Sequence, residues 1–381
     1  MTDISADRNV PAARREPSVP VWDIWVRLFH WSLVLAIVVA SVTGFLLNAS
    51  WIALHVIGGL IAAALVVARI VWGFAGPTHA RFRDFIPAPA ALLAHLRDPG
   101  AHRHLGHNPV GAVMVLALIG AVLALALTGL GQLGGVLKTG PLAFALDHAT
   151  GALLGGLHEA LAIGLLGLVA LHVGGVVFES VRGHENLVRA MVTGRKPRRP
   201  GDRRSRPARP RPFLALAVLG ALGAAAVIAN TTLSARPVPG MPVATLDATY
   251  VAECGACHMA YHPSLLPAGS WRAMMATLDD HFGENASLDD TTAAGIAAWL
   301  AAHAAETADT KPAHRLSRTA PDAPFTLTET PFWTRVHGDL PEALFQRPAI
   351  GRRANCAACH KDAQTGLFSP FAISIPKETT R

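Results

Sequence analysis

The chain has 381 residues, of which 51% are hydrophobic and 15% are charged, and its formal net charge is +7. Soluble domains average about 25% charged residues, so this composition and a mean hydropathy of +0.35 argue against a wholly soluble protein. The charge is also unevenly placed. Residues 182–211 carry eleven Lys and Arg side chains against Glu185 and Asp202, a local charge of +9.

The first twenty residues are polar and contain no short apolar core followed by a small-residue cleavage site. We expect residues 1–20 to be a disordered cytoplasmic tail rather than a signal peptide. A membrane span needs ~20 mostly apolar residues. The runs that meet this requirement are 24–47, 51–75, 109–131, 152–178 and 213–230.

Charges in the loops predict the orientation, because cytoplasmic loops are rich in Lys and Arg. The basic linker 197–212 lies between the fourth and fifth runs, and the 76–108 loop contains four arginines. The 132–151 loop contains only one lysine and one aspartate. A Pro/Arg tract can also indicate nucleic-acid contact, but between two spans we interpret it as a topology signal and expect no nucleic acid. The N-terminus is therefore expected in the cytoplasm and residues 231–381 outside it.

Ionisable groups at membrane depth are costly and usually mark function. The apolar runs contain four histidines: His30, His55, His158 and His172. In "HEALAIGLLGLVALH" (158–172) two histidines are fourteen residues apart, which in a helix gives ~21 Å of rise and a shared face. Haem iron accepts imidazole, and bis-histidine iron suits electron transfer. The spacing therefore predicts two non-covalent b-type haems. The competing interpretation is that these histidines only hydrogen-bond between helices.

Helix direction predicts the pairing. His30 and His172 are expected on the cytoplasmic side, and His55 and His158 on the outer side. Arg69 is expected to pair with propionates of the cytoplasmic haem or, alternatively, to extend to the inner membrane interface.

All four cysteines follow the fifth run, in "ECGACH" (253–258) and "NCAACH" (355–360). C-x-x-C-H is the attachment motif of c-type haem, with two thiols for thioether bonds and a histidine for iron. C-x-x-C alone can also be a redox dithiol or half a zinc site, but the histidine in both copies favours haem. The residues expected to attach two c-type haems are Cys254, Cys257 and His258, and Cys356, Cys359 and His360.

Each c-type haem also needs a sixth ligand or an open site. His281 lies 23 residues after His258, and His337 lies 23 residues before His360. We take both as distal ligands without assigning either to a particular haem. The other candidates are His262, His303, His314, Met259, Met274 and Met275.

Three helix starts can be predicted from capping residues. Asn108 is expected to cap the third span, with Pro109 in its first turn. Ser270 is expected to cap a helix from Trp271, and "SLDD" (287–290) is expected to form a capping box. The region after the fifth run is therefore predicted to be small and mostly helical.

Four segments of the first 196 residues resemble the bacterial cytochrome b561 family, which includes the b-type cytochromes of nickel–iron hydrogenases. They are "VWDIWVRLFHWSLV" (21–34), "RIVWGFAGPTHARFRDF" (69–85), "HLGHNPVGA" (104–112) and "HENLVRAMVTGRK" (184–196). That resemblance implies a four-helix membrane domain over 21–196 with two b haems. The later motifs resemble a small dihaem cytochrome c family, which implies an extracytoplasmic domain within 231–381. The expected fold is all-α, with a fifth membrane helix over 213–230 joining the two parts.

The expected function is electron transfer in a bacterial inner membrane between the quinone pool and an extracytoplasmic cytochrome or other haem protein. We expect a haem-dependent oxidoreductase with lipid, quinone or quinol, and the haem protein as partners. His148 and Glu159 are candidates for quinone or proton chemistry. The alternatives are a superoxide-oxidising enzyme and a haem anchor subunit of a dehydrogenase or hydrogenase.

Overall fold

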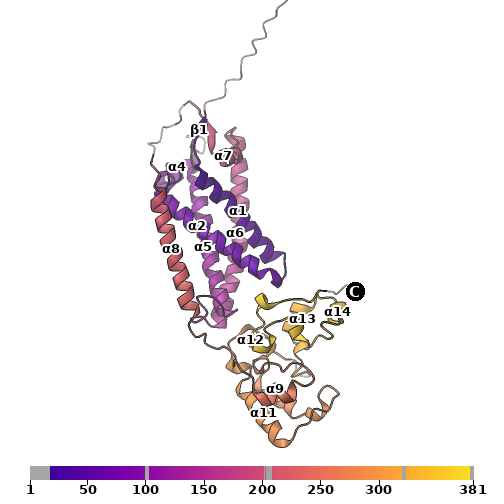
Figure 1. Cartoon of the computed structure of the whole chain (residues 1–381). Helices are drawn as coiled ribbons and strands as arrows, with labels where there is room; N and C mark the ends of the chain where they lie inside the picture. The colour runs from indigo at the N-terminus through magenta and orange to yellow at the C-terminus, as the bar shows by residue number, and fades with distance from the viewer. Residues whose placement is uncertain (1–17, 99–102, 201, 203–207, 320–322, 378–381) are drawn as a thin grey trace, which may run out of the picture. The chain divides into compact units, whose positions relative to one another are not determined.

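The computed structural model describes residues 18–98, 103–200, 202, 208–319 and 323–377, and their regular structure is almost entirely helical. Five helical segments of the described chain are long and apolar enough to cross a membrane, which confirms the five predicted spans. Figure 1 draws these segments as long helical ribbons, labelled α1, α2, α5, α6 and α8. Their bounds are α1 (Ile24–Phe45), η1 with α2 (Ala49–Trp51 and Ile52–Ala75), α5 (Pro109–Gly135), α6 (His148–Arg182) and α8 (Pro212–Ser234).

Helix α6 extends beyond the predicted 152–178 at both ends. At its start, the Asp147 carboxylate accepts a hydrogen bond from the Thr150 amide at 2.8 Å, which caps the helix before the apolar run begins. At its end, Arg182 and Glu179 form an ion pair of 3.2 Å within the last turn. Capping and charge pairing therefore stabilise turns that hydropathy alone would leave out.

The described chain divides into two compact units. One comprises the described residues within 1–38, 60–123 and 161–223, and the other comprises those within 39–59, 124–160 and 224–381. The first unit contains His30 and His172, and the second contains His55 and His158. Each unit therefore contains one of the predicted histidine pairs.

A two-stranded antiparallel sheet closes one end of the first unit. Strand β1 (Ser18–Pro20) pairs with β2 (Arg195–Pro197), with Val19 opposite Lys196. The prediction of a disordered tail is therefore wrong for residues 18–20, because their backbone groups pair with β2. The rest of that predicted tail, residues 1–17, lies outside the described residues, as do 201 and 203–207 of the predicted basic linker.

Short helices and a small apolar cluster complete this end of the unit. The cluster consists of Val21, Trp22, Val26, Ala80 and Ala190. The short helices are α3 (Phe82–Phe85), α4 (Pro89–Arg97) and α7 (Leu187–Thr193).

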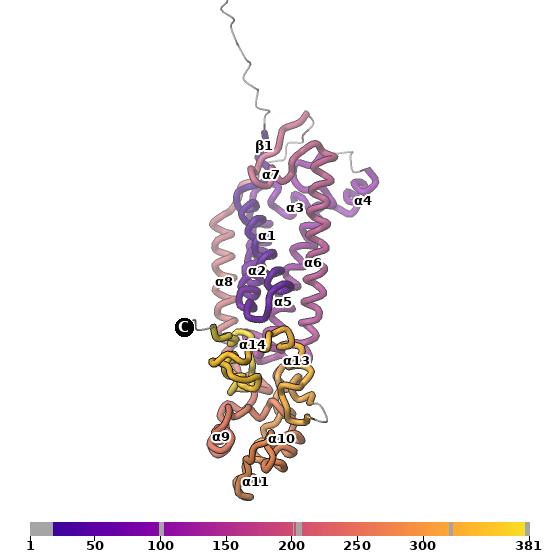
Figure 2. Tube along the Cα trace, turned by 90° about the vertical axis from the view of Figure 1, so that its right-hand side faces the viewer, coloured from indigo at the N-terminus to yellow at the C-terminus, as the bar shows by residue number. Residues whose placement is uncertain are grey.

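The C-terminal part of the second unit consists of short helices joined by loops, shown from rose to yellow in Figure 2. Their bounds are α9 (Ala248–Cys254), α10 (Ala268–Met275), α11 (Asp290–Ala302), α12 (Lys311–Leu316), α13 (Pro331–His337) and α14 (Glu342–Phe345). A core cluster around Trp271 and Leu300 packs against Cys254. A second cluster around Phe345 packs against Cys359. Each cysteine motif therefore has its own apolar surroundings.

The helix caps test the local predictions one by one. Asn108 accepts a hydrogen bond from the Gly111 amide at 2.6 Å, and α5 begins at Pro109, as predicted. The Ser270 prediction is wrong, because Pro267 precedes the first turn of α10 and Ser270 lies inside the helix. The capping box is also wrong: the Asp289 carboxylate, not Ser287, accepts from the Thr291 and Thr292 amides.

Candidate functional site

The structure brings His55 of α2 and His158 of α6 together, with ring centres 6.1 Å apart; we call them the second histidine pair. The Nδ1 atom of each ring lies within hydrogen-bond distance of a backbone carbonyl of a neighbouring helix. The distance is 2.9 Å from His55 to the Ala40 oxygen and 3.0 Å from His158 to the Leu125 oxygen. These contacts leave Nε2 of both rings available as a ligand atom.

The same local sequence holds each ring of the second pair, and the sequence analysis missed it. A Thr-Gly dipeptide follows each accepting carbonyl by three residues: Thr43-Gly44 on α1 and Thr128-Gly129 on α5. A Cβ atom on Gly44 would lie 3.0 Å from Cε1 of His55, and one on Gly129 would lie 3.2 Å from Cε1 of His158. Glycine therefore lets each neighbouring helix approach its histidine. The repeated Thr-Gly pair was the available signal.

His30 of α1 and His172 of α6 form the first histidine pair, with ring centres 6.4 Å apart. Nδ1 of His30 is buried and has no hydrogen-bond partner among the described residues. Among the described residues, His30 therefore lacks the carbonyl contact that both rings of the second pair make. The two sites differ in the contacts that hold their rings.

Arg69 of α2 is buried in the same unit as the first pair, with 4% of its surface exposed. Its guanidinium lies 5.4 Å from the ring centre of Phe82 and 5.8 Å from that of Phe85. Its Nη1 atom is buried without a hydrogen-bond partner among the described residues. A buried cation with an unused donor is suited to an anionic group such as a carboxylate.

The third histidine pair is His258, in the first C-x-x-C-H motif, and His281, with ring centres 6.1 Å apart. Nδ1 of His258 lies 2.8 Å from the Met259 carbonyl. His281 is presented by a tight turn, in which Phe282 and Gly283 have φ values of 57° and 87°. A left-handed conformation is uncommon for phenylalanine. The backbone of the turn that holds His281 is therefore strained at Phe282.

The fourth histidine pair is His360, in the second motif, and His337 of α13, again with ring centres 6.1 Å apart. Nδ1 of His337 lies 3.1 Å from the Trp333 carbonyl, and the Trp333 ring stacks on His337 at 4.7 Å. Burial lowers the pKa of His337 and His360. This favours the neutral imidazole, which is the form that ligates metals.

The spacing within the pairs can be compared with axial ligation of one iron. A ligating imidazole nitrogen lies ~2 Å from its metal, and the ring centre lies about 1 Å further, so two axial imidazoles have centres about 6 Å apart. The four observed separations are between 6.1 and 6.4 Å. Hydrogen bonding of Nδ1 to a carbonyl is also the usual support for an Nε2 ligand. The residues of all four pairs therefore fit a bis-histidine haem.

The four cysteines form no disulfide with one another, and burial raises the pKa of the Cys356 thiol to about 11. Throughout the described chain, no group of three or more His, Cys, Asp or Glu side chains is placed to hold a metal ion.

Four of the other candidate ligands make contacts of their own in the structure. His262 is fully buried and uses both ring nitrogens, Nδ1 with Ser264 Oγ at 2.8 Å and Nε2 with the Val243 carbonyl at 2.9 Å. His314 contacts Asp309 through Nε2 at 2.9 Å. Met274 and Met275 pack against the apolar cluster around Trp271. His262 therefore has a structural role instead of the ligand role left open by its position.

Two family models match different parts of the chain. Residues 21–194 match the model of the prokaryotic cytochrome b561 family, and residues 250–368 match that of the dihaem cytochrome c family. A probable Ni/Fe-hydrogenase B-type cytochrome subunit of Azotobacter chroococcum mcd 1 is 29% identical over 153 residues. That match covers 31% of this chain and 64% of the relative.

A probable Ni/Fe-hydrogenase B-type cytochrome subunit of Rhodobacter capsulatus is 24% identical over 240 residues, covering 51% of this chain and 88% of the relative. The chain spans less than two thirds of two other such relatives, 64% for A. chroococcum and 57% for Azotobacter vinelandii.

Two solved structures are each similar to about a third of this chain. A dihaem c-type cytochrome of Shewanella baltica OS155 is 40% identical, covering 34% of this chain and 92% of that chain, with a TM-score of 0.28. A dihaem cytochrome c of Rhodobacter sphaeroides is 38% identical, covering 33% and 98%, with a TM-score of 0.29. The two family matches identify residues 21–194 as a prokaryotic cytochrome b561 domain and residues 250–368 as a dihaem cytochrome c domain.

Proposed function

We propose that the chain transfers electrons between the quinone pool and an extracytoplasmic haem protein. The observation that carries this proposal is the presence of four histidine pairs, each with the 6.1–6.4 Å spacing of axial ligands. Two pairs belong to membrane helices and would hold haem b. Two include the histidine of a C-x-x-C-H motif and would hold haem c, attached by Cys254, Cys257, Cys356 and Cys359.

Haem bound by two histidines supplies reversible one-electron exchange at an iron without an open coordination site. The chain's own residues orient the ligands. The Ala40 and Leu125 carbonyls fix the rings of His55 and His158. The unused donor of Arg69 would be available to a propionate of a haem held at the first pair. Separate apolar clusters pack against Cys254 and Cys359 at the two attachment sites.

We propose that the chain lies in the bacterial inner membrane with its N-terminus in the cytoplasm and the dihaem domain in the periplasm. The support is the strong positive charge of residues 182–211 and the four arginines of the 76–108 loop. The weakly charged 132–151 loop would then be periplasmic. Attachment of c-type haem outside the cytoplasm agrees with this orientation.

The experiment that tests the cofactor assignment is a pyridine haemochrome spectrum of the purified full-length protein. Equal amounts of haem b and haem c, two of each per chain, are expected. The variant His172→Ala should lose or alter b-type haem while keeping both c-type haems, and His303→Ala should leave all four. Normal b content and spectra in His172→Ala would contradict the assignment of the first pair.

The names of the relatives favour one alternative function, that of a cytochrome subunit for a hydrogenase. It predicts stable co-purification of a dehydrogenase or hydrogenase from the native membrane. The superoxide-oxidising alternative predicts that superoxide reduces the b-type haems faster than quinol does. Stopped-flow mixing with each reductant distinguishes the superoxide reaction from quinol oxidation.

A further inference from the structure

Two buried polar atoms in the C-terminal part of the chain lack hydrogen-bond partners and belong to residues only two positions apart. They are Nδ1 of His360, in the second C-x-x-C-H motif, and Oδ1 of Asp362. Among the described residues after 223, no other buried side-chain nitrogen or oxygen lacks a partner. An imidazole that ligates iron through Nε2 has a donor at Nδ1, and a carboxylate oxygen is an acceptor. The two unmatched atoms are therefore complementary.

We propose that Asp362 accepts the Nδ1 hydrogen of His360, directly or through one water molecule, and thereby lowers the redox potential of the haem at the fourth histidine pair. This inference rests on the proposed function, because it concerns the c-type haem that His360 would ligate. Asp362 is a positioning residue in this account, since its carboxylate acts on the iron through the imidazole.

A tight turn brings the two side chains together. The Ala363 amide donates to the His360 carbonyl at 3.1 Å, so His360 and Asp362 belong to the same turn. Oδ2 of Asp362 accepts from the Ser369 amide at 2.6 Å. The ring of Phe368, the residue before Ser369, has its centre 5.1 Å from that of His360. The segment that Asp362 holds therefore packs against the imidazole, and Oδ1 remains for Nδ1 of the same ring.

The first C-x-x-C-H motif meets the same need with a backbone carbonyl. Nδ1 of His258 lies 2.8 Å from the Met259 oxygen. Nδ1 of His360 makes no such contact with a carbonyl of the described chain. A ligating histidine almost always donates its second ring nitrogen to a carbonyl, a carboxylate or water. The two motifs therefore differ in the acceptor, which is a neutral carbonyl in the first and a carboxylate in the second. A carboxylate makes the imidazole more basic, and a more basic ligand favours oxidised iron.

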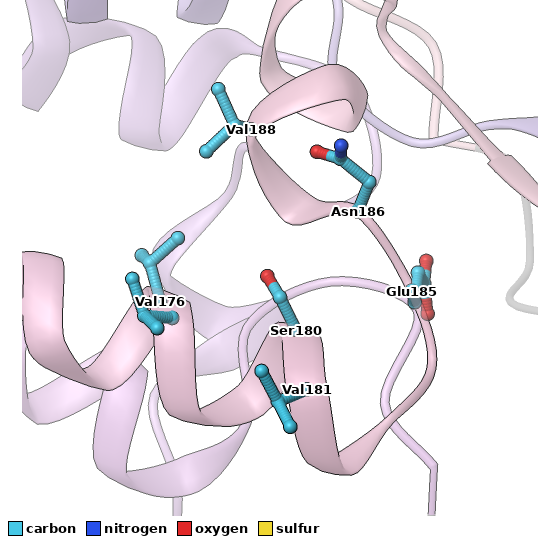
Figure 3. A pocket seen from close by; sticks show the side chains of 7 residues that line it. Val176, Ser180, Val181, Glu185, Asn186 and Val188 are labelled. Carbon is cyan, nitrogen blue, oxygen red and sulfur yellow. The ribbon is translucent and has the colours of Figure 1, made fainter.

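The charge of Asp362 also differs from that of the other carboxylate with a buried, unpartnered oxygen, Glu185. Glu185 lines a cavity of about 370 Å³ between α6 and α7 (Figure 3). Arg103 pairs with Glu185 at 3.0 Å, and Lys196 lies 3.5 Å from its Oε1. Asp362 takes part in none of the ion pairs of the described residues. Its negative charge therefore acts on His360 without an ion-pair partner.

The test is a spectroelectrochemical titration of the full-length protein in nanodiscs, followed in the c-type α-band and resolved into two components. Asp362→Asn removes the charge and keeps an oxygen that can accept from the Ser369 amide. It should shift the ratio of reduced to oxidised haem in one component about tenfold toward reduced, which is ~59 mV for one electron. The double variant Cys356→Ala, Cys359→Ala assigns that component, because it should lack it.

Two further variants separate this role from a structural one. Glu342→Gln makes the same charge change at a side chain that is 53% exposed and pairs with Arg353. Screening by water should keep its shift below about twofold. Asp362→Glu restores the carboxylate and should return the component to within about threefold of the wild type. A solely structural Asp362 predicts a lower unfolding temperature of Asp362→Asn with unchanged potentials.

Three outcomes overturn the inference. They are wild-type potentials of both c-type components in Asp362→Asn, a shift of the component that survives in the cysteine double variant, and an equal shift in Glu342→Gln. If Asp362→Asn does not retain haem c, Asp362→Ser, whose hydroxyl can accept from the Ser369 amide, decides between the same results. Failure of quinol to reduce the wild type contradicts the proposed function instead, and it leaves the titration valid because the electrode sets the potential without quinol.

Discussion

Replacing Gly129 by alanine should raise the midpoint potential of one b-type haem. The added Cβ would lie 3.2 Å from Cε1 and 3.4 Å from Nδ1 of His158. Carbon atoms in contact normally lie about 3.5–4.0 Å apart, so the ring must retreat by a few tenths of an ångström. That movement lengthens the 3.0 Å contact between His158 Nδ1 and the Leu125 carbonyl.

The size of the effect follows from the hydrogen bond. Such a bond contributes about 1 kcal/mol net, and donation by Nδ1 makes the imidazole a more basic ligand, which favours oxidised iron. For a one-electron couple about 1.4 kcal/mol corresponds to ~59 mV. Weakening but not removing the bond should therefore raise the potential by about 20–40 mV.

The assay is a spectroelectrochemical titration of the full-length protein that resolves the two b components. Gly120→Ala is the matched control, because it lies on the same helix and its added Cβ meets nothing within 4 Å. Gly44→Ala, whose Cβ would lie 3.0 Å from Cε1 of His55, should shift the same component. An unchanged potential in both variants, relative to Gly120→Ala, would refute the role given to the Thr-Gly pairs.

Three further predictions concern the parts of the chain outside the membrane spans. Combining Cys356→Ala with Cys359→Ala should halve the covalently bound haem, measured by pyridine haemochrome, and leave haem b unchanged; full c content would contradict the attachment. Burial lowers the pKa of His107 to about 3 from an ordinary 6.5. The unfolded chain therefore binds a proton that the folded chain excludes, and stability should fall by about 2 kcal/mol between pH 6.5 and 5. His107→Phe, placed against Trp22 and Phe85, should remove this loss in thermal unfolding; an equal pH dependence in both proteins would show another group responsible. His262→Ala should lower the unfolding free energy of the C-terminal domain by about 1–3 kcal/mol without changing haem c content. Loss of a haem from this variant would instead indicate that His262 is an iron ligand.

The membrane spans and the cysteine motifs could be predicted because each depends on chemistry that a single segment displays. Hydropathy over ~20 residues marks a span whatever surrounds it, and C-x-x-C-H contains its thiols and its histidine in one short motif. The pairing of His30 with His172 also followed from helix direction alone. The structure adds that the ring of His281 lies beside that of His258, and the ring of His337 beside that of His360, each pair with centres 6.1 Å apart.

What the sequence did not reveal depends on contacts between segments. The Thr-Gly pairs act on histidines of other helices, so nothing in their own segment marks them. Strand β1 required a partner at residues 195–197, far away in sequence. The cap at Asp289 instead of Ser287 reflects the ±1–2 residue uncertainty of helix ends when several oxygen-bearing side chains are adjacent.

The most direct test of the central claim is stopped-flow mixing of a short-chain ubiquinol with the oxidised full-length protein in nanodiscs. Absorbance is followed separately in the b-type and c-type α-bands for the wild type and His158→Ala, with dithionite as the control for reducible c-type haem. We predict that quinol reduces both bands in the wild type and that His158→Ala loses c-type reduction. Reduction of the c-type band at the wild-type rate in His158→Ala would contradict a path through the membrane histidines.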